Sequence, residues 1–216
     1  MLKLIGASAS PFVRKVRVAL AEKGIAYEHD PMVPFGQPPE YLQISPLGKI
    51  PALLDDGKPL SDSSIIIAYL ERKHPSPSLY PQEPYEFARS LWFEEYGDSA
   101  LVQNLTAPIF FQRVIAPRFF NRPTDEAVVQ KAIEVEAPKC LDYLEAQIDD
   151  KEFLAGGQFS VADIGITTHF VNARFADYSV DAQRWPKVAA YLGRMLSRPS
   201  FRDIVKEEAA AFGIEM

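Results

Sequence analysis

The sequence has 216 residues, of which 47% are hydrophobic, and its 23 basic and 29 acidic side chains give a net charge of -6. This composition can bury one sizeable core or two small ones, and the acidic balance argues against a nucleic-acid-binding protein. A single cysteine, Cys140, excludes an internal disulfide, and neither a signal peptide nor a run of 18 apolar residues is visible, so we expect a cytoplasmic protein with no membrane span.

The first 74 residues alternate between short strand-like runs and helical ones. LKLI predicts a strand over residues 2–5, and Val13, Val16 and Leu20 then share one face of a helix that Gly24 ends. AYEHD and IPALL predict two further strands, KPL is a candidate for another, and SSIIIAYLERKH predicts a helix. The order is that of a small α/β unit.

A proline-rich connector, HPSPSLYPQEP, follows this unit. We therefore expect one domain over residues 1–76, a linker over 77–84 and a second domain over 85–216. In this second part apolar residues recur every three or four positions, which predicts helices. The clearest stretches cover residues 85–107, 125–149, 161–176 and 186–197.

Two helix starts and one proline carry the candidate chemistry. Ser10 precedes Pro11 where an N-cap and a first-turn proline belong, and Asp62 opens a second helix. A helix N-terminus attracts a carboxylate, and an acidic side chain attracts an ammonium. If the Ile50–Pro51 bond were cis, Ile50 could offer its backbone N–H and C=O to an extended peptide. Each feature is also explained by an ordinary cap or turn, so their order around one α/β unit is what matters.

Five stretches together resemble the cytosolic glutathione transferase family, in its serine-type, bacterial-like form. They are SPFVRKVRVAL, PLGKIPAL, LSDSSIIIAYL, FLAGGQFSVADIGI and WPKVAAYLGRMLSRPSF. The resemblance implies an α/β thioredoxin-like N-terminal domain that binds glutathione and an all-α C-terminal domain that carries the electrophile pocket. It also implies a homodimer, in which the segment YEFARSLWFEEYGDSA is expected to contact the other subunit.

By the same resemblance, Ser10 is the catalytic hydroxyl. A thiol with a pKa near 8.5 is only a few per cent ionised at pH 7, and lowering that pKa by about two units needs roughly 2.7 kcal/mol. A charge-assisted hydrogen bond of about 1.5–3 kcal/mol, helped by the positive end of a helix, is sufficient. Ser8 lies two residues earlier and can reach the same loop, so it is the rival residue.

The resemblance also implies the residues that bind glutathione. Ile50 and Pro51 correspond to the segment that pairs with the cysteinyl backbone, and Asp62 and Ser63 to the group that holds the γ-glutamyl end. Many relatives have glutamate in place of Asp62, whose reach is shorter. Lys49 is placed to meet the glycyl carboxylate, and it is equally well explained as a solvated lysine.

The implied reaction is attack of the glutathione thiolate on a small hydrophobic electrophile. We expect the electrophile pocket between the domains, lined by Phe12 and by residues 109–120, with Phe111 and Arg113 as candidates and Arg113 or Arg118 able to recognise an anion. The alternative is a non-catalytic or weakly catalytic glutathione-fold binding or regulatory protein, because a fold alone does not fix function.

Other polar residues have plainer explanations. Arg14, Lys15 and Arg17 are expected on a solvated helix face, and Ser160 with Asp163 forms a structural capping box. The three histidines have no ligand spacing with cysteine or acidic residues, so no metal is expected; they are His29, His74 and His169.

Overall fold

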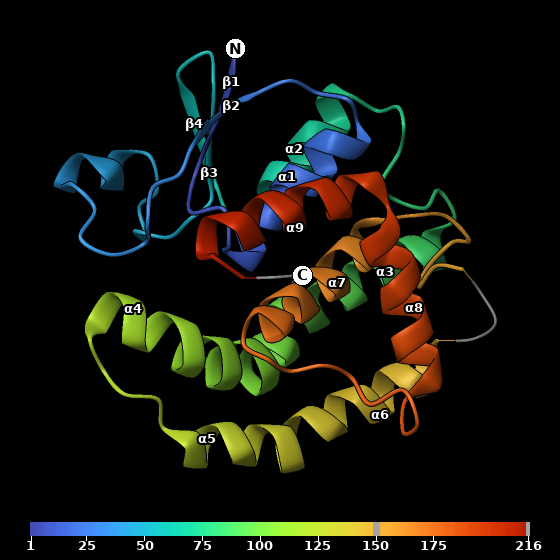
Figure 1. The fold of residues 1–216 in the computed structure, drawn as a ribbon. Coiled ribbons are helices and arrows are strands. Elements are labelled where there is room, and N and C mark those ends of the chain that lie inside the picture. Colours follow the sequence, from blue (N-terminus) through green and yellow to red (C-terminus); the bar gives the residue numbers. More distant parts are fainter. Residues whose placement is uncertain (149–151, 215–216) are drawn as a thin grey trace.

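The computed structural model describes residues 1–148 and 152–214 (Figure 1). The N-terminal part is a four-stranded sheet in the order β2-β1-β3-β4. Strand β1 (Leu2–Ile5) pairs in parallel with β2 (Glu28–Asp30) and antiparallel with β3 (Ala52–Asp55), which pairs antiparallel with β4 (Lys58–Ser61). The α/β unit predicted from the sequence is confirmed, including the strand at KPL.

Two helices accompany this sheet. Helix α1 (Pro11–Glu22) connects β1 to β2 and ends before Gly24, whose φ of +63° suits the left-handed residue that closes a helix. Helix α2 (Ser63–Lys73) follows β4, and the two helices pack against each other. A short 3-10 turn, η1 (Pro39–Gln43), lies in the long connection between β2 and β3.

The rest of the described chain is helical, as the sequence predicted. A first helical column runs through α3 (Pro84–Tyr96) into η2 (Gly97–Ile115), which has wider π-helical turns, and then α4 (Ala116–Phe120). The remaining helices are α5 (Glu126–Lys131), η3 (Ala132–Glu136), α6 (Ala137–Gln147), α7 (Val161–Phe175), α8 (Pro186–Ser197) and α9 (Pro199–Phe212). Across the described ranges, no helix combines the length and the apolar character that crossing a membrane requires.

Helix α7 is the centre of the molecule. It packs against α3, η2 and α1 in the middle of the fold (Figure 1). All its residues but Arg174 are buried. Two glycines permit the close approach, because a Cβ on Gly97 would lie 2.6 Å from the carbonyl oxygen of Gly165. The capping box at its start is confirmed, since the Ser160 N–H donates to Asp163 at 2.9 Å.

The expectation of a solvated basic face on α1 is wrong. Arg14 and Lys15 are fully buried, and Arg17 is 5% exposed. Lys15 lies 3.0 Å from Glu94 and 2.5 Å from Asp98. Helix α9 and the α3–η2 column cover this side of α1 and supply acidic partners, which the local sequence does not reveal.

Candidate functional site

The register of the sheet brings the three predicted segments to one end. Ile5 pairs with Ala52, and Ala52 pairs with Ser61. The loop to Ser10 leaves the sheet just after Ile5, the Ile50–Pro51 pair enters it just before Ala52, and Asp62 follows Ser61 directly. The candidate site is therefore built by strand pairing from residues that are far apart in the chain.

Ser10 lies at the N-terminus of α1. Its Oγ accepts the N–H of Val13 over a long 3.5 Å, and its side chain is half-buried. Within residues 1–148 and 152–214, its O–H donates to no protein acceptor. The hydroxyl proton is thus available to a ligand at the positive end of the helix. Ser8 is also half-buried and lies outside the helix.

Gly6 holds the Ser10 loop against the Ile50 turn. Its φ is +148°, and a Cβ there would lie 2.5 Å from Val13 Cγ2 and 3.1 Å from Ile50 Cβ. A glycine is required both for this backbone angle and for this close contact. The Gly6 N–H donates to the Asp30 carbonyl at 2.8 Å, which ties the turn to β2.

The Ile50–Pro51 peptide bond is cis. In the part of the chain that the structure describes, neither the N–H nor the C=O of Ile50 has a hydrogen-bond partner. The preceding carbonyl, that of Lys49, accepts from Tyr41 Oη at 2.9 Å and from Ser45 Oγ at 2.7 Å. This turn is therefore fixed on one side and leaves Ile50 with a free donor and a free acceptor. The Lys49 side chain is exposed.

Asp62 and Ser63 form the N-terminus of α2. Asp62 Oδ1 accepts the N–H groups of Ser64 at 2.9 Å and Ile65 at 3.2 Å, while Ser63 is buried in the first helical position. Asp62 has a φ of +79°, which a residue with a Cβ adopts at a cost of about 1–3 kcal/mol, and such strain gathers at functional sites. Its other carboxylate oxygen has no hydrogen-bond partner within residues 1–148 and 152–214, so it is available to an ammonium group.

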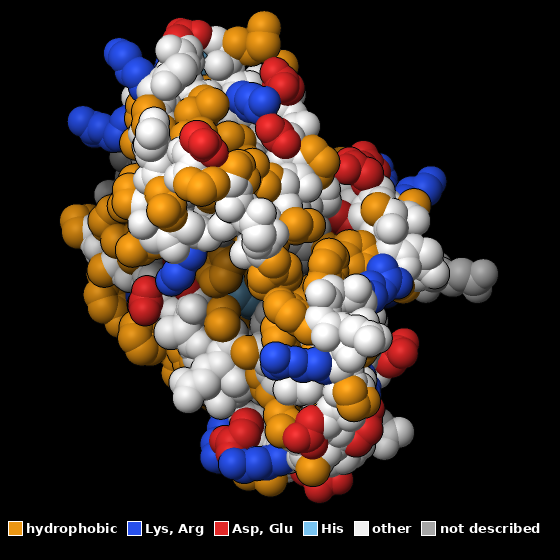
Figure 2. Space-filling view, turned by 90° about the vertical axis from the view of Figure 1, so that its left-hand side faces the viewer, with side chains coloured by type: hydrophobic (Ala, Val, Ile, Leu, Met, Phe, Trp, Pro, Cys, Tyr) orange, Lys and Arg blue, Asp and Glu red, His pale blue; other side chains and the backbone are white. Residues whose placement is uncertain are grey.

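An aromatic cluster, composed of Phe35, Phe111, Phe119 and Phe120, bridges the two parts of the molecule. Phe35 lies in the loop after β2, and its ring centroid is 4.9 Å from that of Phe120 and 5.9 Å from that of Phe119. Phe111 lies 5.9 Å from Phe120. Figure 2 shows hydrophobic side chains around a hollow on this face of the molecule. Sequence reasoning missed Phe35, because a single aromatic residue in an irregular loop carries no periodic signal.

Phe12 and the two arginines are placed differently from this cluster. The Phe12 ring meets His169 edge to face at a centroid distance of 6.0 Å. Arg113 donates to the Ala176 carbonyl at 3.0 Å and to Glu126 at 3.2 Å, and Arg118 donates to the Phe212 carbonyl at 2.7 Å. Both guanidinium groups therefore hold helices of the C-terminal part together.

A buried polar cluster lies beneath the site. Ser64 Oγ donates to Glu94 at 2.8 Å, and Lys15 bridges Glu94 and Asp98. Burial lowers the pKa of His169, although Asp98 at 3.7 Å opposes that shift, so the imidazole is neutral at pH 7. Within the described ranges, no group of three or more histidine, cysteine or acidic side chains is arranged to hold a metal ion.

Family models match both parts of the chain. Residues 4–78 match "Glutathione S-transferase, N-terminal domain" and residues 126–194 match "Glutathione S-transferase, C-terminal domain". The chain is 32% identical to "Glutathione S-transferase 3" of Zea mays, over 94% of this chain and 93% of that one.

Solved structures show the same likeness. A glutathione S-transferase from Rhodospirillum rubrum F11 superposes with a TM-score of 0.86 at 28% identity, covering 94% of this chain and 91% of that one. A glutathione S-transferase-I bound with lactoylglutathione superposes with a TM-score of 0.83 at 28% identity, covering 95% of this chain and 98% of that one.

Proposed function

Since this chain belongs to the glutathione S-transferase family, we propose that it binds glutathione at the shared end of its sheet and activates the thiol with Ser10. It is a transferase that uses glutathione as co-substrate. The glutathione thiolate attacks a small hydrophobic electrophile. The assignment of residues rests on one observation: two helix N-termini and the free backbone groups of Ile50 lie together at one end of the sheet.

In the proposed binding mode, each group binds a different part of glutathione. Ile50 pairs with the cysteinyl backbone through its free N–H and C=O, next to Pro51. The free oxygen of Asp62 accepts from the γ-glutamyl ammonium, and the N–H of Ser63, which has no intrahelical acceptor, binds the neighbouring carboxylate. The exposed Lys49 meets the glycyl carboxylate.

In the proposed mechanism, the Ser10 O–H donates a hydrogen bond to the glutathione sulfur and the N-terminus of α1 adds its positive dipole. Together these contributions are about 2–4 kcal/mol, which lowers the thiol pKa by roughly two units. The thiol proton leaves to solvent. The thiolate then forms the new S–C bond, and the leaving group departs with its electron pair.

We propose that residues 1–76 bind glutathione, that 77–84 are the linker and that 85–216 supply most of the electrophile pocket. Phe12 and Phe111 remain candidate pocket residues, and the aromatic cluster adds Phe35 from the other side. Arg113 has a weaker claim, because its hydrogen bonds to Ala176 and Glu126 occupy it.

The single buried cysteine supports a cytoplasmic location.

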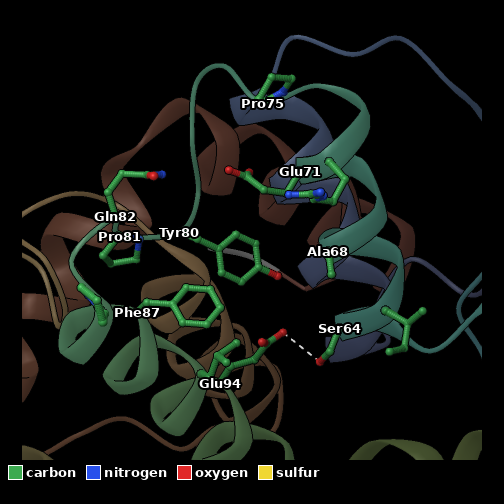
Figure 3. A pocket seen from close by; sticks show the side chains of 13 residues that line it. Ser64, Ala68, Glu71, Pro75, Tyr80, Pro81, Gln82, Phe87 and Glu94 are labelled. Carbon is green, nitrogen blue, oxygen red and sulfur yellow. Dashed lines mark hydrogen bonds between the residues drawn. The ribbon is translucent and has the colours of Figure 1, made fainter.

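We also propose that the protein is a homodimer. A groove of about 870 Å³ lies between α2 and α3, lined by Ser64, Ala68 and Glu71 on one side and by Phe87, Leu91 and Glu94 on the other (Figure 3). Ile65 also lines this groove and is exposed, and α3 carries two further exposed aromatic side chains, Tyr85 and Trp92. A second copy covering α3 would bury these side chains.

The test is a panel of electrophiles and peroxides assayed with glutathione, together with calorimetry of glutathione binding. We expect saturable binding and turnover of at least one electrophile. Tight binding of glutathione without turnover across the panel would contradict catalysis and favour the binding-protein alternative.

A further inference from the structure

The backbone carbonyls on both sides of Ser10 are held by side chains of α7. Asn172 Nδ2 donates to the Ala9 carbonyl at 2.9 Å, and Thr168 Oγ1 donates to the Pro11 carbonyl at 2.9 Å. The two donors are four residues apart, so they lie on one face of α7. A helix of the C-terminal part thus fixes the loop that presents the hydroxyl.

Arg14 determines which way these two side chains point. Its Nη1 donates to Asn172 Oδ1 at 2.7 Å and to the Thr168 carbonyl at 2.8 Å, and it also lies 3.2 Å from Thr168 Oγ1 as a donor. A guanidinium group has donors and no acceptors. The Asn172 oxygen must therefore face Arg14, which leaves its NH₂ group for Ala9. The single hydroxyl proton of Thr168 is likewise left for Pro11.

The arginine is itself anchored on both sides. Its backbone N–H donates to the Ser10 carbonyl at 2.9 Å, and its Nε donates to Glu208 of α9 at 2.7 Å. Arg14, Thr168, Asn172 and Glu208 all have no exposed surface. Burying an ion pair gives little net stability over a well-packed apolar core, so stability alone does not account for this network. The hydrogen bonds among these side chains do, however, restrict how each of them can move.

We propose that Arg14, Thr168 and Asn172 are positioning residues for Ser10, through which α7 sets how well the hydroxyl stabilises the glutathione thiolate. This inference rests on the proposed role of Ser10. A misplacement of about 1 Å at a reacting group can cost roughly 100-fold in rate. Loss of one anchor should therefore weaken thiolate stabilisation without removing any group that touches glutathione.

The experiment compares Thr168→Val, Thr168→Ser and Thr167→Val with the unmodified protein. Valine matches threonine in shape and removes the hydroxyl, whereas serine restores it. Thr167 is the matched control, since it is equally buried on α7 and, among the described residues, its Oγ1 has no hydrogen-bond partner. The measurements are the pKa of the bound thiol by thiolate absorbance, the pH profile of kcat/KM, the KM for glutathione and the Tm.

We expect Thr168→Val to raise the pKa of the bound thiol and to lower kcat by roughly 10-fold to 100-fold at pH 6.5, with little change in the KM for glutathione. Thr168→Ser should restore the thiol pKa. Thr167→Val should leave the thiol pKa unchanged and should not lower the Tm, because the hydroxyl that it removes has no hydrogen-bond partner in the described part of the chain. Equal thiol pKa values in Thr168→Val and Thr167→Val would overturn the positioning role.

A second variant tests the other anchor, which is the hydrogen bond from Asn172 to the Ala9 carbonyl. Asn172→Asp keeps the acceptor for Arg14 and loses the donor to Ala9, so we expect the same rise in thiol pKa. Ser10→Ala separates the two hypotheses: if it leaves the thiol pKa unchanged, the proposed role of Ser10 fails. If Ser10→Ala raises the thiol pKa and neither α7 variant does, only the positioning role fails.

Discussion

Asp62 Oδ1 accepts the backbone N–H of Ser64 at 2.9 Å, so the carboxylate proposed to bind glutathione is also the N-cap of α2. One oxygen serves the helix, and the other is free for a ligand. An alanine at this position would lose both functions and would also have to adopt the φ of +79°. Alanine is therefore a poor probe of the binding role.

Asp62→Gly separates the two functions. Glycine adopts a positive φ without strain and is a fair N-cap, so the Tm should stay close to that of the unmodified protein. Loss of the carboxylate should weaken glutathione binding by about tenfold to a hundredfold, which calorimetry would measure. Asp62→Asn keeps an acceptor oxygen, so its affinity for glutathione should lie between those of the unmodified protein and Asp62→Gly.

Asp125→Gly is the control for Asp62→Gly. Asp125 caps α5 with the same pair of bonds, to the N–H groups of Ala127 and Val128, on a helix far along the chain from the site. It should leave glutathione affinity unchanged. An Asp62→Gly protein that binds glutathione as tightly as its parent would withdraw Asp62 from the site.

Ser10→Ala should lower turnover while glutathione affinity changes little, because the hydroxyl acts on the thiolate and not on the peptide. Removal of one charge-assisted bond should raise the pKa of the bound thiol by about one to two units and slow the reaction roughly tenfold to a hundredfold at pH 6.5. The long 3.5 Å bond to Val13 means that little capping is lost. Ser8→Ala is the partner experiment, and a dead Ser8→Ala beside an active Ser10→Ala would reassign the catalytic hydroxyl.

The order of the elements could be predicted because their signals are local. Ser10 and Pro11 at a helix start, and the apolar runs of β1 and β3, need no knowledge of the rest of the chain. The surroundings of Ser10 could not be predicted in this way. Arg14 meets Asn172 and Glu208, which are 158 and 194 residues away, and no local pattern marks them as partners.

The same limit applies to the electrophile pocket. Residues 109–120 were predicted to lie at the domain interface, and Phe120 does meet Phe35 of the N-terminal part. The sequence makes Arg113 a candidate for recognising an anion, since it lies in an aromatic-rich stretch. Its actual partners, Ala176 and Glu126, are set by how α5 and α7 each pack against η2, which is a tertiary property.

Lys15→Met should strongly destabilise the fold. Lys15 is buried between Glu94 and Asp98, and removal of a buried cation leaves two uncompensated carboxylates, a loss of about 3–5 kcal/mol in the free energy of unfolding. Urea denaturation would measure it. Lys139→Met removes an exposed lysine that pairs with Glu136 at 2.6 Å, and it should change stability very little. Similar losses for both variants would contradict the buried role of Lys15.

Phe87→Glu should break the proposed dimer. Phe87 lines the groove between α2 and α3 and is 41% exposed in the single chain. A carboxylate there would be buried without a partner on association. Sedimentation should give twice 24.2 kDa for the unmodified protein and 24.2 kDa for this variant. Val135→Glu, at a side chain that is 47% exposed on η3, should remain dimeric. An unmodified protein that sediments at 24.2 kDa at micromolar concentration would rule out the dimer.

Asp163 should make stability depend on pH in the acid range. Burial raises its pKa from the usual 3.8 to about 6, although the N–H groups of Leu154 and Ser160 and the hydroxyl of Tyr191 donate to it and oppose that shift. The folded protein therefore holds this proton up to about pH 6, whereas the unfolded chain releases it near pH 4. The stability contributed by proton binding is complete below pH 4 and is lost as the pH rises through 6.

The comparison with Asp163→Asn, which cannot titrate, isolates this effect. The variant loses acceptors in the capping box and should be less stable than the unmodified protein at every pH. The stability advantage of the unmodified protein should shrink by roughly 2–3 kcal/mol between pH 4 and pH 7, because only its aspartate must release a buried proton. Denaturant unfolding of both proteins across this range measures the difference in their free energies of unfolding. The other carboxylates titrate in both proteins, so their contributions cancel. An advantage that grows with pH would mean that the four hydrogen bonds donated to Asp163 outweigh its burial and hold its pKa below 3.8.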